Sequence, residues 1–433
     1  MRRKLVLLLA LVLSLFLITF IVGVIMEWEL AENSYDPNLF GMHEAITYRH
    51  LSEEKLNISR AFEVLQSLGV RKIREPIWRW YMNDSTTIKN ETIKNAGECV
   101  IYNANLSGIE IMGYVQDFPS WMTGIEGDQQ TVPHRNMTEG SKYRQFLEVY
   151  EESWESWARA FPEIEVWEIG NEYNLPQFLH PQSGTFSLQE RVDIVTDLLY
   201  WGSRGIKTGN PNATTVMCGL GPIEKSTYGN GIYDIRDFLN LIYENIESGR
   251  WPSTDPDDFF QVACWHPYIS EKPNEENWVK PNKAVYDVMK KHGDGDKRVV
   301  FSEMGFSDNC PGLSKEEVAG YLLETFRLAK DNFPWLDTIY WFRLIDPDPE
   351  YDPNLNCSEY GYGIVETPRE NWLWKSAACT YESLAHPKPI DHSAEWLIMV
   401  VISGIIGANT VAGVTTCFVR KMRKQQSHNE HVM

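Results

Sequence analysis

Strand-like and helix-like segments alternate eight times along this chain of 433 residues, and the alternation limits the possible folds more than any other feature. Each strand-like run is short and rich in β-branched and aromatic residues, and a longer amphipathic stretch follows it. Parallel neighbouring strands need such a crossover, usually a helix. The pattern therefore predicts an α/β fold, a (β/α)8 TIM barrel. The expected strands cover residues 39–43, 70–75, 110–115, 166–170, 215–219, 259–265, 298–302 and 338–342, and the expected helices cover residues 52–68, 87–105, 143–161, 188–209, 232–248, 281–292, 314–332 and 370–384.

Two long uncharged runs flank the predicted barrel, at residues 5–26 and 397–419. Each run has the ~20 residues that a transmembrane helix needs. Basic residues lie on the terminal side of both runs, so the positive-inside rule places both termini in the cytoplasm and the barrel outside the cell. A cleaved signal peptide is the alternative for the first run, although no small-x-small cleavage site follows it. The predicted location is the cell membrane, with lipid as a partner through both spans.

This reading divides the chain into five parts. They are an N-terminal anchor at residues 1–27, a TIM-barrel domain at 28–386, a linker at 387–396, a transmembrane helix at 397–419 and a basic cytoplasmic tail at 420–433. The transmembrane helices would therefore flank the barrel on both sides.

Glycosylation sequons and cysteines agree with an exterior barrel domain. Cys310 and Cys357 follow the seventh and eighth expected strands, whose exits lie on one barrel face, so a disulfide between them is predicted. Cys218 and Cys264 lie inside expected strands and are predicted to be buried thiols. Acceptor sequons of the type Asn-x-Ser/Thr occur at Asn57, Asn83, Asn90, Asn105, Asn136, Asn212 and Asn356.

The overall charge narrows the class of ligand. The formal net charge of −20 argues against a nucleic-acid partner, and no basic patch stands out in the middle of the chain. The 16 Trp and 20 Tyr residues can fill a core, but such rings also stack on the apolar faces of sugars. No cofactor or metal ion is expected, because the histidines are scattered and no His-x-x-x-His spacing occurs near the candidate residues.

Two of the expected strands end in a glutamate. The run VWEIGNE ends in Asn171 and Glu172, and the run RVVFSEMG places Glu303 at the end of a second apolar strand. The carboxyl ends of barrel strands surround the active cleft, so both glutamates are expected to border one cavity. A retaining glycosidase needs such a pair roughly 5–5.5 Å apart, one to protonate the leaving oxygen and one to attack the anomeric carbon. The alternative is that both are ordinary surface residues at strand ends.

These motifs, together with polar residues at other strand exits, resemble the clan A glycoside hydrolases over residues 39–384. Within the clan, the chain is most similar to the cellulase-type families and to family 39. The resemblance implies a carbohydrate substrate, with Glu172 as the acid/base and Glu303 as the nucleophile. It also implies supporting residues at strand exits: Asn171 for the sugar 2-hydroxyl, Arg74 and Tyr268 beside Glu303, His266 near Tyr268, and Trp341 as the floor of the reacting subsite.

Two further aromatic residues complete the candidate substrate-binding set, His43 at the exit of the first strand and Trp121 in the turn after the third. Several candidates also have a structural alternative. Arg74 could pair with a barrel carboxylate for stability only, and His266 could be a hydrogen-bonded core histidine. The rings of Trp341 and Trp121 suit core packing as well as sugar stacking.

The sequence thus predicts a membrane-anchored, outward-facing retaining glycoside hydrolase of surface or environmental glycans. Two alternatives stay open on the same barrel. One is a non-catalytic carbohydrate-binding protein of the cell envelope. The other is a transglycosylase, in which the covalently held sugar passes to a second sugar rather than to water.

Overall fold

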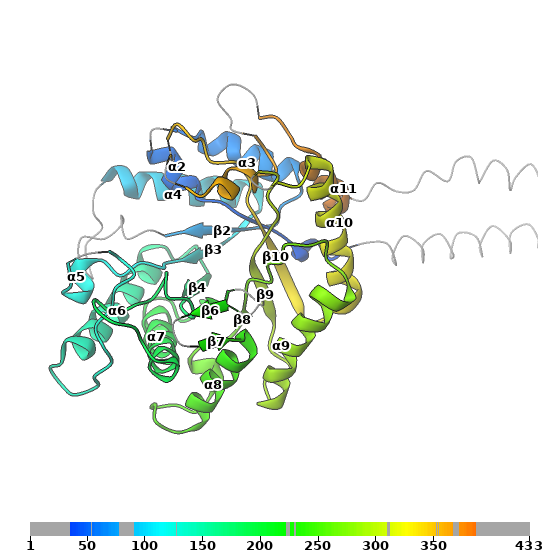
Figure 1. Cartoon of the computed structure of the whole chain (residues 1–433). Coiled ribbons are helices and arrows are strands. Elements are labelled where there is room, and N and C mark those ends of the chain that lie inside the picture. The colour runs from blue at the N-terminus through cyan, green and yellow to red at the C-terminus, as the bar shows by residue number, and fades with distance from the viewer. Residues whose placement is uncertain are drawn as a thin grey trace, which may run out of the picture. The chain divides into compact units, whose positions relative to one another are not determined.

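Parallel strands lie at the centre of the part of the chain that the structure describes (Figure 1). The structure is a computed structural model, and it describes residues 35–386 except residues 53, 78–90, 127, 222–225, 229–230, 310–311, 352, 354 and 367–371. One eight-stranded sheet has the order β5-β4-β3-β2-β1-β10-β9-β8. Its strands are β1 (Phe40–His43), β2 (Lys72–Pro76), β3 (Glu110–Tyr114), β4 (Val166–Asn171), β5 (Thr214–Gly219), β8 (Ala263–Cys264), β9 (Val299–Met304) and β10 (Leu336–Phe342).

The two ends of this sheet meet. Parallel bridges join Val216 to Val262 and Leu220 to Trp265, on either side of the two-residue strand β8. The backbone N–H of His266 then donates to the carbonyl of Leu220 at 2.8 Å. These contacts place β5 beside β8 and confirm the predicted (β/α)8 barrel.

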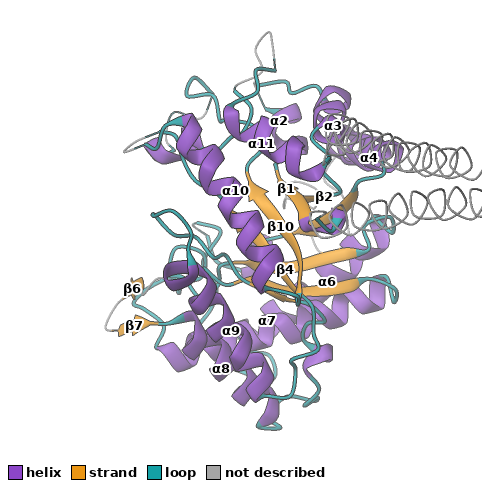
Figure 2. Cartoon of the chain, turned by 90° about the vertical axis from the view of Figure 1, so that its right-hand side faces the viewer, coloured by secondary structure: helices purple, strands orange, loops and turns teal. Residues whose placement is uncertain are grey.

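Helices cover the outside of the strands (Figure 2). The α-helices are α2 (Ile46–Leu51), α3 (Ile58–Ser67), α4 (Glu91–Ser107), α5 (Ser120–Thr123), α6 (Lys142–Ala160), α7 (Leu188–Gly209), α8 (Ile235–Glu247), α9 (Lys280–Lys291), α10 (Lys315–Asn332) and α11 (Ser376–Ala385). Short helical turns occur at η1 (Pro37–Leu39), η3 (Pro256–Asp258), η4 (Glu275–Val279) and η5 (Cys357–Gly361). A hairpin of β6 (Ser226–Tyr228) and β7 (Gly231–Tyr233) forms a separate two-stranded sheet after β5, which the sequence pattern did not predict.

Side-chain capping explains where α3, α6, α7, α8 and α10 begin. At α10 the cap is a capping box, in which Ser314 accepts from the N–H of Glu317 and Glu317 reaches back to Ser314. The predicted helix at 52–68 is wrong in extent, because two helices occupy this region. Asn57 rather than Ser52 caps α3, and Ser52 instead ends α2 by donating to the carbonyl of Arg49.

Side chains of β4 alternate between the helix layer and the barrel interior. Trp167 packs edge-to-face against Trp154 of α6, with ring centroids 6.0 Å apart. Its neighbour Glu168 is fully buried on the opposite face, where the guanidinium of Arg74 on β2 contacts it. At the level of β4, the barrel therefore carries charged groups on its inside and large apolar rings on its outside.

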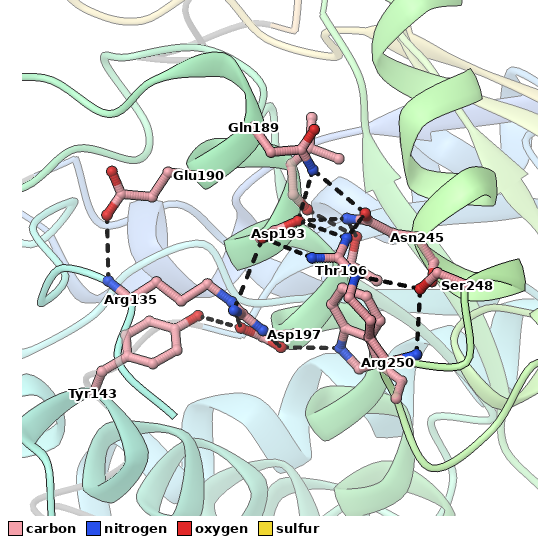
Figure 3. A network of polar contacts seen from close by, with 12 residues as sticks. Arg135, Tyr143, Gln189, Glu190, Asp193, Thr196, Asp197, Asn245, Ser248 and Arg250 are labelled. Atoms are coloured by element: carbon pink, nitrogen blue, oxygen red, sulfur yellow. Dashed lines mark hydrogen bonds and ion pairs between the residues drawn. The ribbon is translucent and has the colours of Figure 1, made fainter. Parts of the chain in front are cut away.

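A buried polar network ties three helices together at a distance from the strand interior (Figure 3). Asp197 of α7 accepts from Arg135 at 2.7 Å, from the Tyr143 hydroxyl of α6 at 2.9 Å and from the Trp251 indole at 2.9 Å. One turn earlier, Asp193 accepts from Arg250, and from the amides of Gln189 and Asn245. We call this set the helix-layer network; each of its two carboxylates is matched by a guanidinium.

The structure contradicts the prediction of a membrane-anchored protein. In residues 35–386, outside the gaps given above, no helix is both long enough and apolar enough to cross a bilayer. The predicted spans at 5–26 and 397–419 lie outside the described residues. The predicted cell-membrane location is corrected accordingly, and the two spans play no part in the function proposed here.

The cysteine predictions have mixed outcomes. Cys218 and Cys264 are free and fully buried, as predicted. Cys310 lies outside the described residues, so its pairing with Cys357 stays a prediction. Glycosylation likewise stays a prediction; Asn83 and Asn90 lie outside the described residues, and the other five sequon asparagines are exposed.

Candidate active site

A cavity of about 760 Å³ opens at the carboxyl ends of the barrel strands. Residues at or after six of the barrel strands, β1, β3, β4, β8, β9 and β10, contribute to its wall, which is typical of the functional face of this fold. The lining residues are His43, Ala45, Tyr114, Gln116, Asn171, Glu172, Gln177, Phe178, Tyr268, Ile269, Ser270, Glu303, Phe342, Arg343, Asn356, Glu359 and Tyr362.

The two glutamates singled out from the sequence converge in this cavity. One carboxylate oxygen of Glu172, one of Glu303 and one ring nitrogen of His266 all lie within 4.8 Å of one another. Both carboxylate side chains are mostly buried, with 13% and 14% of their surface exposed. A carboxyl pair about 5–5.5 Å apart suits attack and protonation on a single sugar ring, whereas pairs about 6.5–9.5 Å apart leave room for a water.

The backbone around Glu172 adopts an unusual conformation. Its φ angle of +48° is left-handed, a region that residues other than glycine seldom occupy. Gly170, with φ of +98°, makes the turn possible, because a Cβ there would lie 2.0 Å from the ring of Tyr173. Gly221 makes room for the carboxylate itself, since a Cβ there would lie 2.1 Å from Oε1 of Glu172. The GNE motif thus aims Glu172 back across the cavity.

Arg74 joins the two halves of the site from the end of β2. Its guanidinium donates to Glu303 Oε1 at 2.6 Å, to Asn171 Oδ1 at 2.7 Å and to Glu168 Oε2 at 2.5 Å. It also lies 3.7 Å from the ring centroid of Tyr114. Burial alone would lower the pKa of Arg74, but the contributions of Glu168, Tyr114 and Glu303 together outweigh burial, and the pKa is raised. A permanent positive charge is therefore fixed against Glu303.

Glu168 is a central residue that the sequence reasoning missed. Besides Arg74, it accepts from the Ser302 hydroxyl at 2.8 Å and from the Gly219 N–H at 2.9 Å. A glutamate in the middle of an apolar strand signals a buried charge that needs partners, and this signal was available in the sequence. The alternation of side chains along β4 carries the same signal, because Trp167 and Ile169 face the helix layer and Glu168 therefore faces the barrel interior.

His266 links Glu172 to the same group of residues. Its Nδ1 lies 2.6 Å from Glu172 Oε1, and its Nε2 lies 2.8 Å from Ser302 Oγ. An unbroken series of polar contacts thus runs through Glu172, His266, Ser302, Glu168, Arg74 and Glu303. We call this set the site network. Burial alone would lower the pKa of His266, but the charges of Glu303 and Glu172 raise it above its ordinary value.

The surroundings of Glu303 favour its charged form. Burial alone would raise its pKa, but the charges of His266 and Arg74 lower the pKa below the ordinary value of a glutamate. The Tyr268 hydroxyl donates to Glu303 Oε2 at 3.1 Å. Burial, with the nearby charge of Glu303, raises the pKa of Tyr268 well above the usual value, so this phenol keeps its proton.

Other predicted site residues have different fates. His43 lines the cavity, and its Nδ1 lies 3.2 Å from Nη1 of Arg74. Burial and the charge of Arg74 hold the pKa of His43 well below its ordinary value, so the ring is neutral. Trp121 is half-buried against the hydrophobic core and is not among the cavity-lining residues.

The prediction for Trp341 is wrong. This ring is fully buried and packs between Phe306 and Phe326, with centroids 6.1 and 6.3 Å away. Successive strand residues point to opposite faces, so the next residue, Phe342, reaches the cavity instead. Phe342 lies edge-to-face with Tyr362 at 5.4 Å, and both rings line the cavity.

Two groups of side chains in the described residues have the proximity that a metal ion requires: Glu168, Cys264 and His266, and Glu172, His266 and Glu303. Existing contacts occupy the atoms concerned. Both ring nitrogens of His266 and both oxygens of Glu168 already have hydrogen-bond partners. A mixed set of this kind lacks the free ligand positions of a zinc site.

Comparisons with known proteins agree on the fold. No protein-family model matches the chain, and none of the curated proteins matches it. A family 39 glycoside hydrolase from the gut symbiont Bacteroides cellulosilyticus WH2 superposes with a TM-score of 0.54 at 14% identity, covering 81% of this chain and 64% of that one. A family 1 β-glucosidase from Thermotoga maritima gives 0.55 at 15%, covering 82% and 98%.

A GH5_18 variant from Streptomyces cattleya, in complex with Manβ1-4GlcNAc, gives a TM-score of 0.56 at 15% identity, covering 80% of both chains. Identities this low show a shared barrel fold alone. All three neighbours are glycoside hydrolases by name.

Proposed function

We propose that this protein is a retaining glycoside hydrolase in which Glu303 is the nucleophile and Glu172 the acid/base. The observation that carries the proposal is the approach of the two carboxylates to within 4.8 Å in a cavity at the carboxyl ends of the strands. That separation fits the two-step route through a covalent glycosyl-enzyme better than direct attack by water. Both reacting groups are enclosed, so their charges act in a poorly solvated space.

In the first step, Glu303 attacks the anomeric carbon while Glu172 protonates the leaving oxygen. Arg74 and Tyr268 keep Glu303 anionic through its two oxygens, and the same contacts hold it in place for attack. The amide of Asn171 is oriented by Arg74, which binds its Oδ1. Its N–H groups are then available to the 2-hydroxyl of the reacting sugar, where a hydrogen bond strengthens in the transition state.

The supply of the proton follows from the direction of the hydrogen bonds. Ser302 has one hydroxyl hydrogen and donates it to Glu168, so Nε2 of His266 must carry a hydrogen that points at Ser302 Oγ. The 2.6 Å contact between His266 Nδ1 and Glu172 Oε1 then holds one proton between the two residues. Glu172 and His266 share this proton, which is given to the leaving oxygen in the first step and is recovered from water in the second.

Azide rescue of two variants tests the assignment. In Glu303→Gly, azide takes the place of the missing carboxylate, so a glycosyl azide of inverted anomeric configuration is expected. In Glu172→Ala, a 2,4-dinitrophenyl glycoside still forms the covalent intermediate, and azide gives a product of retained configuration. NMR of the products reads the configuration, and exposed Glu63→Gln is the matched control. Full turnover by both variants without azide would remove the proposal, and glycan binding without any turnover would favour the non-catalytic alternative.

A further inference from the structure

One wall of the cavity takes no part in the site network. It is built by the segment after β10, with Arg343 at the exit of the strand and Glu359 on η5, both lining the cavity. The catalytic side of the cavity is saturated with internal hydrogen bonds, whereas this wall is not. The contrast suggests that the wall is completed by a ligand.

The two charged side chains of this wall have no hydrogen bond or ion pair within the described part of the chain, although Cζ of Arg343 lies 4.5 Å from the centroid of the Phe342 ring. The guanidinium of Arg343 makes no side-chain hydrogen bond or ion pair there, and its Nε is shielded from solvent and unsatisfied. The carboxylate of Glu359 is likewise without a hydrogen bond, although burial raises its pKa. Leaving buried donors and acceptors unpaired costs free energy, and such groups commonly mark functional positions.

The wall is held firmly despite these unpaired groups. The N–H of Arg343 donates to the carbonyl of Tyr362, and the N–H of Ile364 donates to the carbonyl of Arg343. The Ser307 hydroxyl donates to the carbonyl of Ser358 at 2.6 Å, which fastens η5 to the segment after β9. The backbone that carries Arg343 and Glu359 is therefore already ordered, and binding of a ligand need not order it.

The charges of the cavity select the kind of ligand. Two carboxylates that line it, Glu303 and Glu359, oppose one guanidinium, Arg343; the third lining carboxyl group, Glu172, shares a proton with His266. Arg74 is buried behind the lining and already occupied by three acceptors, and His43 is neutral. A ligand with a carboxylate, sulfate or phosphate would meet net repulsion, whereas vicinal hydroxyls can accept from Arg343 and donate to Glu359.

We propose that Arg343 and Glu359 form a sugar subsite that binds hydroxyl groups of a neutral glycan, and that the cavity discriminates against acidic glycans. The proposal deepens the glycosidase function and rests on it for the identity of the reacting sugar. The cavity volume of about 760 Å³ supports it, since pockets of about 300–1,000 Å³ enclose ligands larger than one sugar ring. The ring of Tyr362, which lines the cavity beside the two charges and makes only edge-to-face ring contacts, offers an apolar face for stacking.

Binding to an inactive form of the whole chain tests the subsite without turnover. Calorimetry on Glu303→Gln would use neutral disaccharides, namely cellobiose, mannobiose, xylobiose and lactose, beside an aldobiuronic acid. We expect at least one neutral sugar to bind, and Arg343→Met and the nearly isosteric Glu359→Gln each to weaken it about 10-fold or more, the usual loss for a hydrogen bond to a charged group. The paired surface residues Arg60 and Glu63 supply controls, as Arg60→Met and Glu63→Gln should change binding less than two-fold.

Three outcomes would overturn the subsite: no binding of any neutral sugar, binding within two-fold of the parent in both cavity variants, or tighter binding of the acidic sugar. The preference for neutral over acidic sugar gives a second measurement, because each cavity variant changes the net charge. Because Glu359→Gln removes one negative charge, it should narrow the preference for neutral over acidic sugar, whereas Arg343→Met should widen it. If the wild-type chain hydrolyses no aryl glycoside but the variants lose sugar binding, the catalytic proposal fails and the subsite stands. The reverse result leaves the catalytic proposal and removes the subsite.

Discussion

Two buried polar networks in this barrel look alike in composition but differ in how they end. The helix-layer network pairs Asp193 and Asp197 with Arg135 and Arg250 (Figure 3), and its members bond to one another. The site network pairs Glu168 and Glu303 with a single guanidinium and ends on carboxylate oxygens in the cavity. Buried charge alone therefore does not identify a functional site; an end that opens onto a cavity does.

The difference has a physical basis. A buried carboxylate that has its own guanidinium is stabilised in its charged form and resists protonation. In the site network, Arg74 is shared among three acceptors and His266 shares a proton with Glu172. Charge in this network can move during a reaction, whereas charge in the helix layer cannot. Four substitutions test this contrast.

The largest expected effect is at Arg74. In Arg74→Met, kcat/KM should fall by roughly 10²- to 10³-fold, the range for removal of one preorganised electrostatic group. The variant also removes a charge that lowers the pKa of Glu303. In the wild type, Glu303 stays ionised below its ordinary pKa, so the acid limb of kcat/KM lies at low pH; in the variant the limb should move to higher pH. The counterpart Arg135→Met should leave the pH profile of kcat/KM unchanged. Equal shifts of this profile in both variants would contradict the distinction between the site network and the helix-layer network.

A smaller effect is expected from steric displacement of Glu172, the proposed acid/base. In Gly221→Ala, the new Cβ would lie 2.1 Å from Glu172 Oε1, so the carboxylate must move. A displacement of this size should lower kcat by roughly 10²-fold, while leaving-group activation by a 2,4-dinitrophenyl group should recover part of the rate. Gly320→Ala on α10 is the control, because nothing lies within 4 Å of its added Cβ. Unchanged kcat in Gly221→Ala would show that Glu172 is not positioned as described.

The helix-layer network should respond in stability rather than in rate. Asp197→Asn removes the charge of a fully buried carboxylate that pairs with the partly buried Arg135, and breaking a buried pair typically costs up to about 3–5 kcal/mol. Denaturant unfolding should record a loss in this range, while kcat/KM below the unfolding transition should stay within about three-fold of wild type. A selective loss of kcat/KM in a fully folded Asp197→Asn would contradict the assignment of this network to structure.

The smallest effect on function should come from Trp341. The ring packs in the core and does not reach the cavity, so Trp341→Phe should reduce the free energy of unfolding by about 1–2 kcal/mol without changing KM. Phe342→Leu, one residue further on, should raise KM instead. If Trp341→Phe raised KM while Phe342→Leu did not, the side-chain directions in β10 would be wrong.

Strand ends were predictable from the sequence, because an apolar run that stops at a glycine is a local signal. The same is true of the Ser314–Glu317 cap, which depends on residues three apart. The convergence of Glu172 and Glu303 followed from barrel geometry once the strands were assigned. Asn171, Arg74, His266, Tyr268 and His43 all lie in or directly behind the cavity; their roles are proposals.

Features that depend on side-chain direction or on loop folding were not predictable in the same way. Trp341 and Phe342 differ by one position, and a shift of one residue exchanges the two faces of a strand. Glu168 was passed over because its partners come from three other strands. The wall at Arg343 and Glu359 forms only because a long segment folds back on the strand exit, and no periodic pattern encodes that return.

The return of the segment between Arg343 and Ile364 has an evolutionary consequence. Its two ends meet through adjacent backbone hydrogen bonds, so the intervening residues can lengthen, shorten or be replaced without disturbing the register of β10. Substrate preference could then diverge by replacement of the segment between Arg343 and Ile364. Glu172 and Glu303, which follow other strands, would remain under separate selection.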